Sequence, residues 1–530
     1  MRMAQEAMRA IGRSDFAGAQ RIARQMLLQD PRDANANQIL GIAALEAGDP
    51  ATAKKFLERA DQAAPGQPLI LNTLGVALDK LGELDGARRA FKRAGELGLV
   101  DGWRNLGDLE HNARNADLSI AIYQRALKLA PNDAAAHAAL AQAYEVRHDL
   151  AQAKTHAIAA MKADQNSEIA RLALGNVLLR EKEFANAEIV VAPLVRAAGG
   201  SKNNQALAWG VIGEARDREG DTHSAFQAFT AANRILLEQN GALLSATHLL
   251  YHPAGVREMT DLVEAANVAA WDIPAAFDTP APVFLVGFPR SGTTLLDQIL
   301  SSHSGIVCME EREHFANALA GVISDKARLA KFESLSAGEI EAVRAEYWAR
   351  VKEGMGALPN ALLVDKLPLN IVVLPLIKRV FPDAKIIFAL RDPRDVILSC
   401  YQQRFGMNAA MAQFLELNSA AAYYDAMMRL MERCRARLDL NLHQVRYEDV
   451  VADLETAARA LTAFLGVDYE PAMLSFSDTA RKKVIYTPSA RQVTQPLYAR
   501  SVGRWRRYAD NLAPILPVLA PWAERFGYPP

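Results

Sequence analysis

The chain has 530 residues, of which 50% are hydrophobic and 23% charged, so we expect a globular protein of two or three domains. Lys plus Arg number 60 and Asp plus Glu number 61, a balance that predicts no nucleic acid partner and no attraction to an anionic membrane. The three cysteines lack metal-ligand or CxxC spacing, and no stretch has the roughly 18 apolar residues of a membrane span. The N-terminal residues also lack the apolar core of a signal peptide. We therefore expect a cytoplasmic protein with no structural metal.

The first part of the chain contains a pattern that recurs about every 34 residues. A small residue follows an apolar one at corresponding places of predicted helices, namely at Gly41, Gly75, Gly107, Ala141, Gly175 and Gly213. Over about residues 1–240 this resembles the tetratricopeptide repeat family, whose period is 34 residues. The resemblance implies an all-α superhelix that binds a peptide or a partner protein on its concave face. A spacer or a dimerisation arm is the alternative, because no residue of the pattern identifies a ligand.

The repeat period is lost after residue 240, and prolines and turn residues gather between Trp271 and Pro282. A bridging helix is expected over residues 256–269. These features predict a domain boundary. We expect a repeat array over residues 1–240, a helical connector over 241–280 and a second folded domain over 281–530.

The second domain begins with a strand, a glycine-bounded loop and a helix. The loop runs from Gly287 to Thr294, and its backbone N–H groups and the following helix N-terminus form a seat for an oxyanion. Its spacing is that of a phosphate-binding P-loop, except that Thr293 stands where nucleotide triphosphatases have lysine. Arg290 supplies a forked cation instead. The missing lysine argues against ATP or GTP hydrolysis, and a chance glycine-rich turn is the structural alternative.

Charged residues follow the later predicted strands of this domain. Glu310 and Glu311 come after the first helix and offer a candidate general base, although a solvated charge run would look the same. Lys366 follows the predicted strand 361–364. Because α/β proteins collect ligands at the carboxyl ends of parallel strands, we expect these side chains in one site. A helix is expected over residues 369–380.

A second anion site is predicted after the strand at 385–390. Arg391 leaves this strand, and Ser399 lies in the next helix, so both can face one phosphate. The alternative is a salt bridge within the loop between Arg391 and Asp392 or Asp395. The alternation of strands and helices predicts a P-loop-like α/β domain with a parallel sheet.

The loop at 287–294 together with Arg391 and Ser399 resembles the two nucleotide signatures of sulfotransferases, which use 3′-phosphoadenylyl sulfate. Several further features are most similar to the tyrosylprotein sulfotransferase branch, and the resemblance covers about residues 281–530. They are Glu310-Glu311, Lys366 near a proline, Tyr447-Glu448 after a strand, and residues 488–493 ahead of Arg504-Trp505.

This resemblance implies a role for each matching residue, and it implies no metal. Glu311 would be the general base, while Lys366 and Arg290 would stabilise charge on the transferred group. The remaining residues would bind the co-substrate: Arg290, Ser291, Gly292, Thr293 and Thr294 on the 5′-phosphosulfate, Arg391 and Ser399 on the 3′-phosphate, Tyr447 near the adenine, and Ser489 and Arg504 closing over the nucleotide.

The chain departs from that branch at two positions. Glu313 stands where the branch has arginine, which puts recognition of an acidic peptide in doubt. Arg504 replaces a lysine and so keeps the charge but changes its geometry. Histidine is the base in other sulfotransferases, and for this chain the candidate bases rank Glu311, then Glu310, then His314, with His303 expected to be packed.

The sequence thus predicts a sulfotransferase whose repeats bind the acceptor or a partner. The acceptor stays open among a protein tyrosine, a peptide, a sugar hydroxyl of a glycan or lipid, and a small phenol. Two other functions compete with this one. A non-catalytic repeat scaffold with a nucleotide-binding fold is the first, and a kinase or nucleotide triphosphatase is the second.

Overall fold

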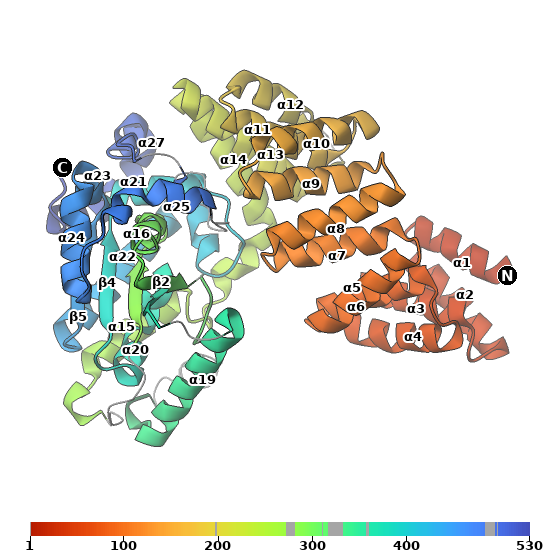
Figure 1. The fold of residues 1–530 in the computed structure, drawn as a ribbon, viewed down its shortest axis with the longest axis horizontal. Helices are drawn as coiled ribbons and strands as arrows, with labels where there is room; N and C mark the ends of the chain where they lie inside the picture. Colours follow the sequence, from red (N-terminus) through yellow and green to blue (C-terminus); the bar gives the residue numbers. More distant parts are fainter. Residues whose placement is uncertain are drawn as a thin grey trace. The chain divides into compact units, whose positions relative to one another are not determined.

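The computed structural model describes residues 2–196, 199–271, 281–309, 311–315, 332–356, 360–482, 493–494 and 497–530. The chain forms two compact units, Met1–Pro193 and Leu194–Pro530. The first is all-α and the second contains a parallel sheet, so the expected fold class is confirmed (Figure 1).

The first unit is a stack of helical hairpins in which the successive helices from Arg2–Gly12 to Glu168–Arg180 each pack on the next in sequence (Figure 1). Its helices are α1 (Arg2–Gly12), α2 (Phe16–Gln29), α3 (Ala34–Glu46), α4 (Pro50–Ala63), α5 (Pro68–Lys80), α6 (Leu84–Glu96), α7 (Val100–Asn112), α8 (Ala116–Leu129), α9 (Ala134–Val146), α10 (Leu150–Ala163), α11 (Glu168–Arg180) and α12 (Phe184–Arg196), the last of which crosses the division between the units. Aspartates cap several of these helices through the backbone N–H three residues on, among them Asp15, Asp33, Asp49, Asp133 and Asp149.

The recurring small residues allow the two helices of a hairpin to pack closely. A Cβ atom at Gly41 would lie 2.5 Å from the side chain of Leu57, and one at Gly75 would lie 2.5 Å from Phe91. The large residue of the second helix therefore occupies the space that the glycine leaves in the first. The same pairing occurs between Gly107 and Tyr123. This steric requirement explains why a 34-residue period is visible in the sequence.

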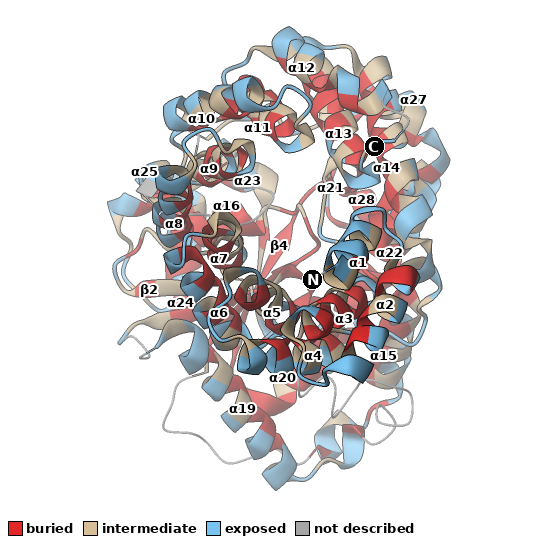
Figure 2. Ribbon diagram, turned by 90° about the vertical axis from the view of Figure 1, so that its right-hand side faces the viewer, coloured by how far each residue is buried: buried red, intermediate tan, exposed pale blue. Residues whose placement is uncertain are grey.

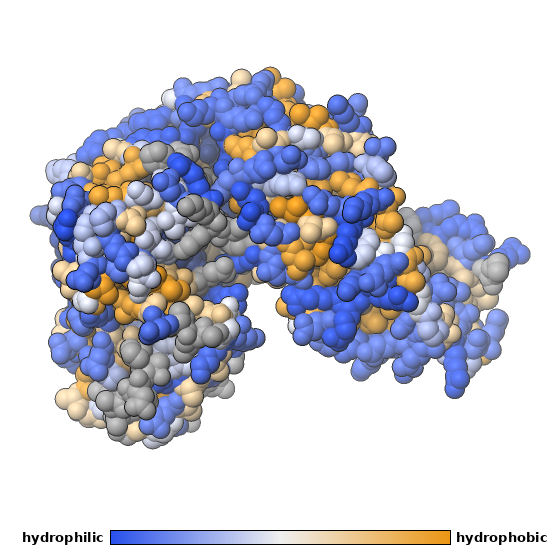
Figure 3. Space-filling view, viewed as in Figure 1, coloured by the Kyte–Doolittle hydropathy of each residue, from blue (hydrophilic) through white to orange (hydrophobic). Residues whose placement is uncertain are grey.

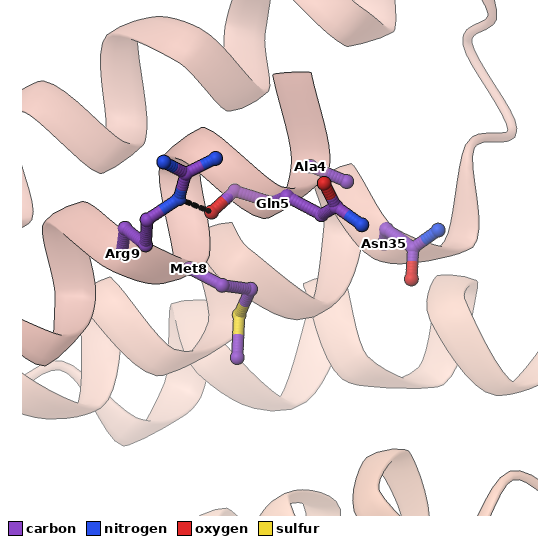
Figure 4. A pocket seen from close by; sticks show the side chains of 5 residues that line it. All are labelled: Ala4, Gln5, Met8, Arg9 and Asn35. Atoms are coloured by element: carbon purple, nitrogen blue, oxygen red, sulfur yellow. Dashed lines mark hydrogen bonds between the residues drawn. The ribbon is translucent and has the colours of Figure 1, made fainter. Parts of the chain in front are cut away.

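Exposed apolar side chains are scattered over the repeats, for example Leu28, Leu118 and Leu129 (Figure 3). Figure 4 shows a pocket between α1 and α3, lined by Ala4, Gln5, Met8, Arg9 and Asn35. Arg9 lies at one side of it and donates a hydrogen bond to the backbone oxygen of Gln5 at 3.4 Å. Its lining is neutral apart from Arg9, so it identifies no ligand.

The second unit begins with the long helical hairpin of α13 (Lys202–Glu219) and α14 (Thr222–Asn240). By sequence this hairpin continues the repeat pattern, but by packing it belongs with the sheet. A short 3₁₀ helix (Gly241–Ser245), α15 (Pro253–Ala265) and a second 3₁₀ helix (Val268–Ala270) follow. The bridging helix predicted at 256–269 is therefore α15, which begins earlier because Pro253 occupies its first position.

The sheet has five strands in the order β2-β3-β1-β4-β5, and every neighbouring pair is parallel. The strands are β1 (Val283–Gly287), β2 (Ile306–Met309), β3 (Leu362–Lys366), β4 (Lys385–Leu390) and β5 (Asn441–Arg446). Since β1 leads outward to β2 and β4 leads outward to β5 on the other side, the chain changes direction between β1 and β4. Ligands of such sheets bind in the crevice at this switch point.

Helices cover both faces of the sheet, so its central strands are buried (Figure 2). Alternate residues enter two cores: Phe284 and Val286 enter one, whereas Val283 and Leu285 enter the other. The helices are α16 (Thr293–Leu300), α19 (Ala337–Met355), α20 (Leu374–Val380), α21 (Pro393–Gln402), α22 (Leu417–Arg437), α23 (Tyr447–Ala452), α24 (Leu454–Leu465), α25 (Phe476–Lys482), α27 (Ala509–Leu512) and α28 (Leu516–Arg525). A 3₁₀ helix, η7 (Arg504–Tyr508), precedes α27.

The single α-helix predicted over residues 369–380 is wrong in detail. The segment forms a 3₁₀ helix at Pro368–Val373 and then α20. Pro375 stands in the first turn of α20 and has no N–H to donate to a preceding turn, so the α-helix starts there instead of continuing through it.

Candidate active site

The carboxyl ends of the parallel strands bring the predicted residues to one edge of the sheet. β1 ends at Gly287, β3 at Lys366, β4 at Leu390 just before Arg391, and β5 at Arg446 just before Tyr447. Residues far apart in the sequence therefore share one edge because all these strands run in the same direction.

The loop after β1 has the backbone geometry of an anion seat. Arg290 has a φ of 70° and Gly292 a φ of 100°, both in the left-handed region, and α16 begins at Thr293. Successive N–H groups turned in this way, together with a helix N-terminus, present positive dipoles to one point. The hydroxyl of Ser291 is buried there and has no hydrogen-bond partner among the described residues. The loop therefore fits an oxyanion ligand.

Gly287 is required by close packing at the start of this loop. A Cβ atom there would lie 2.6 Å from Ser291 Oγ and 2.8 Å from the backbone oxygen of Ala389. We expect Gly287→Ala to lower the free energy of unfolding by about 1–3 kcal/mol, the usual cost of overpacking, measured by urea denaturation. Gly338→Ala in the first turn of α19 meets no atom within 4 Å, so this control should be neutral or slightly stabilising. Equal stability of the two variants would contradict the packing argument.

Arg290, Ser399 and Arg391 lie together beside the loop. Arg290 Nε donates to Ser399 Oγ at 3.0 Å, and Arg391 Nη1 donates to the backbone oxygen of Arg290 at 3.3 Å. Arg391 also donates to the backbone oxygen of Ser501 at 2.6 Å, and its guanidinium lies 4.8 Å from the ring centre of Tyr447. The Nε atom of Arg391 is buried without a hydrogen-bond partner in the described part of the chain. Residues of two predicted anion sites are thus in direct contact.

The loop salt bridge considered as the alternative for Arg391 is present only as a long contact with Asp395, and the close ion pair of this loop is that of Asp392 with Arg394. Asp392 pairs with Arg394 at 2.8 Å, and Asp395 is 4.0 Å from Arg391, at the outer limit of an ion pair. Asp395 instead accepts the backbone N–H groups of Gly503 and Trp505, each at 2.7 Å. Arg391 therefore keeps its guanidinium directed at backbone oxygens and at the ring of Tyr447.

Burial lowers the pKa of Arg290 to about 10, and the nearby guanidinium of Arg391 contributes to the same shift. Arg290 is still cationic at neutral pH. Its charge is poorly solvated, however, and a bound anion would relieve this cost.

Lys366 forms the second charged centre of the site. Its side chain is 2% exposed, and Nζ lies 2.7 Å from Glu311 Oε1 and 3.3 Å from Asp297 Oδ2 of α16. Burial acts to lower the pKa of Lys366, but the two carboxylates outweigh it and raise that pKa above its ordinary value. Two of the predicted catalytic residues, Glu311 and Lys366, are therefore hydrogen-bonded to each other.

The histidines considered as alternative bases are engaged in structural contacts. His303 lies in the turn after α16 and its Nε2 is 2.7 Å from the backbone oxygen of Asp468. His314 is buried, and its Nδ1 is 3.0 Å from Asp365 Oδ2. Tyr347 donates to the same carboxylate oxygen at 2.8 Å, so this network fastens the segment that follows Glu311 to β3.

The remaining residues predicted to bind the co-substrate or to act as the base do not all lie at the loop. Tyr447 is the first residue of α23 and borders the loop, since a Cβ atom on Gly292 would lie 2.9 Å from its ring. Arg504 begins η7 and pairs with Asp217 at 2.8 Å. Thr294 is buried in the first turn of α16. Glu310 and Ser489 lie outside the described residues.

Sequence reasoning missed Asp297 and Asp217, and it considered Asp395 only as a partner of Arg391. Each is a buried acid with a partner from a distant part of the chain: Lys366 for Asp297, Arg504 for Asp217 and Gly503 for Asp395. Asp297 carried a signal that could have been used, because it is a charged residue within the apolar stretch of a helix that follows an anion loop.

The described part of the chain contains no helix that is both long and apolar enough to cross a bilayer. Nor does it contain a group of three or more His, Cys, Asp or Glu side chains arranged to hold a metal ion.

Comparison with known proteins connects both halves of the chain to known families. Residues 282–471 match the model of the sulfotransferase family, and residues 5–68, 72–134 and 44–98 match tetratricopeptide repeat models. The first match supports a transferase.

An uncharacterized protein of Aquifex aeolicus is 25% identical over 347 residues, which are 62% of this chain and 43% of that protein, so the chain spans less than half of that relative. Protein-tyrosine sulfotransferase A of Caenorhabditis elegans is 22% identical over 262 residues, 47% of this chain and 67% of that one. The solved structure of Pseudomonas aeruginosa PilF covers 38% of this chain and 91% of its own, with 17% identity and a TM-score of 0.34. Residues 282–471 of this chain are thus similar to the sulfotransferase family, and residues 5–68, 72–134 and 44–98 are similar to tetratricopeptide repeats.

Proposed function

We propose that the protein transfers a sulfuryl group from 3′-phosphoadenylyl sulfate to a hydroxyl of an acceptor. The observation that carries this proposal is the contact of Arg290 with Ser399 and Arg391 beside a P-loop-like turn that has Thr293 in place of lysine. This site offers two adjacent anion seats built from arginine and hydroxyl groups, which suits a nucleotide with anionic groups on both its 5′ and 3′ positions.

In this proposal the loop residues Arg290, Ser291, Gly292, Thr293 and Thr294 bind the 5′-phosphosulfate. The Ser291 hydroxyl, which has no hydrogen-bond partner among the described residues, and the left-handed backbone at residues 290 and 292 support this role. Other residues bind the rest of the nucleotide: Arg391 and Ser399 the 3′-phosphate, Tyr447 the adenine side, and Ser489 and Arg504 the outer side. The bound co-substrate supplies the sulfuryl group itself.

The side chains Glu311, Lys366 and Arg290 carry the proposed chemistry. The carboxylate of Glu311 accepts the proton of the acceptor hydroxyl, whose oxygen forms the new bond to sulfur as the bond from sulfur to the phosphate oxygen breaks. Lys366 and Arg290 stabilise the negative charge on the moving group and on the departing phosphate. The contact of Lys366 with Glu311 supports the role of Lys366, because it places this cation beside the base at which the acceptor oxygen would meet the sulfuryl group.

Protein tyrosine is the acceptor class that the Caenorhabditis elegans relative suggests, and a glycan or small-molecule hydroxyl is the competing class. Glu313 stands two residues after the proposed base, at a position where the protein-tyrosine branch has arginine. An arginine there would attract an acidic peptide, whereas the carboxylate of Glu313 would repel it. We propose that the repeats bind the acceptor or a protein partner, in keeping with the interaction role of such arrays.

One experiment tests the proposal on the full chain. Titration calorimetry with adenosine 3′,5′-bisphosphate should show binding that Arg391→Ala weakens about tenfold or more, since this variant removes a charge-assisted hydrogen bond. Incubation with labelled co-substrate and a cell extract should then label protein, saccharide or lipid and so identify the acceptor. No binding of the bisphosphate would favour the non-catalytic scaffold, and Mg²⁺-dependent ATP turnover would favour a nucleotide triphosphatase.

A further inference from the structure

The hairpin of α13 and α14 makes buried polar contacts with the sheet domain inside the second unit. Asp217, in the last turn of α13, is 6% exposed. Its Oδ2 lies 2.8 Å from Nη2 of Arg504, and its Oδ1 accepts the hydroxyl hydrogen of Tyr508 at 2.7 Å. A carboxylate from the hairpin therefore binds both ends of η7.

Arg504 is held from two sides by two different carboxylates. Asp395 of α21 accepts the backbone N–H groups of Gly503 and Trp505, the two neighbours of Arg504. Asp217 holds the guanidinium itself. Burial acts to lower the pKa of Arg504, but Asp217 outweighs it and raises that pKa, so the cation is maintained. Asp395 thus fixes the backbone position of Arg504, and Asp217 fixes the direction of its side chain.

The same hairpin supports the helix that carries Ser399. Tyr401, two residues further along α21, has its hydroxyl 2.9 Å from Thr230 Oγ1 of α14. Its backbone oxygen accepts from Asn233 at 3.0 Å. Both segments with proposed nucleotide contacts, α21 and η7, are therefore fastened to a hairpin that the sequence assigns to the repeats.

We propose that Asp217 is a positioning residue for nucleotide binding, which acts by holding the guanidinium of Arg504 in its binding direction. This inference rests on the proposed function. An arginine whose direction is fixed before binding loses less rotamer freedom when the anion arrives. The hairpin of α13 and α14 then contributes to nucleotide binding, in addition to continuing the repeat pattern.

The test is Asp217→Asn in the full chain, with adenosine 3′,5′-bisphosphate as the probe in calorimetry. We expect the dissociation constant to rise about five- to tenfold, because the side chain of Arg504 would then lose its rotamer freedom only when the nucleotide binds. The KM for the co-substrate should rise by the same factor, with less change in kcat. Asp217→Glu, which keeps the charge, should restore part of the affinity. In an Arg504→Gln background, Asp217→Asn should have no further effect.

Asp221→Ala is the matched control, because it removes a contact inside the same hairpin, the cap on the backbone N–H of Ser224 at the start of α14, and not a contact with Arg504 or α21. Thermal unfolding of each variant separates folding from positioning. Equal loss of affinity in Asp217→Asn and Asp221→Ala would show a merely structural role and overturn the inference, as would unchanged or tighter binding by Asp217→Asn. A wild-type chain that binds no bisphosphate would instead overturn the proposed function, and the inference with it.

Discussion

Replacing Glu311 by glutamine is expected to lower the turnover of sulfuryl transfer about 10²- to 10⁴-fold, the contribution of a positioned general base. Glutamine has nearly the same shape but cannot accept the proton of the acceptor. Its amide oxygen can still accept the hydrogen bond that Lys366 Nζ now donates to Glu311 at 2.7 Å. The affinity for adenosine 3′,5′-bisphosphate should therefore be unchanged, as calorimetry can verify beside a turnover assay with labelled co-substrate.

Two variants serve as controls for this assignment. Glu310→Gln changes the neighbouring carboxylate, and His314→Gln changes a buried histidine that contacts Asp365. Both should retain most of the turnover, with His314→Gln also lowering thermal stability because it leaves part of a buried carboxylate unpaired. Full turnover in Glu311→Gln would reject Glu311 as the base, and a selective loss in Glu310→Gln would move the role to that residue.

The fold could be predicted from the sequence because its signals are local. In several repeats a glycine faces a large residue sixteen positions on, as Gly41 faces Leu57 and Gly75 faces Phe91, so this packing appears in the sequence at a fixed spacing. Strands such as β4 are buried on both faces and read as continuous apolar runs. Because these strands are parallel, short motifs at their ends, such as those of Arg290 and Arg391, converge without any further information.

The supporting acids of the site could not be predicted in this way. Asp395 meets Gly503 across 108 positions, and Asp217 meets Tyr508 across 291 positions. No spacing rule spans such intervals, since the contacts depend on how whole elements pack. The pairing of Asp392 with Arg394, two residues on, also became evident only from the structure, because the spacing is compatible with either arginine.

Replacing Lys366 by methionine is expected to have two large effects. The variant should lose about 3 kcal/mol of unfolding free energy, because removing one member of a buried ion pair leaves its partners uncompensated. Those partners are Glu311 at 2.7 Å and Asp297 at 3.3 Å. Turnover should fall about 10²- to 10³-fold through loss of a cation at the transferred group. Urea denaturation and the turnover assay measure the two effects separately.

The pH dependence of stability provides a stricter form of this prediction. The pKa of Lys366 is higher in the folded than in the unfolded chain, so its stabilisation is complete below the unfolded value of about 10.4 and is lost as pH rises through the folded value. The wild type should therefore lose more stability at alkaline pH than Lys366→Met does. Lys385→Met is the control at the start of β4, on the other side of β1 from β3, since Lys385 Nζ donates only to the backbone oxygen of Leu465 among the described residues. That variant should cost about 1 kcal/mol and keep the alkaline loss of the wild type, and an equal alkaline loss in Lys366→Met would contradict the ion-pair account.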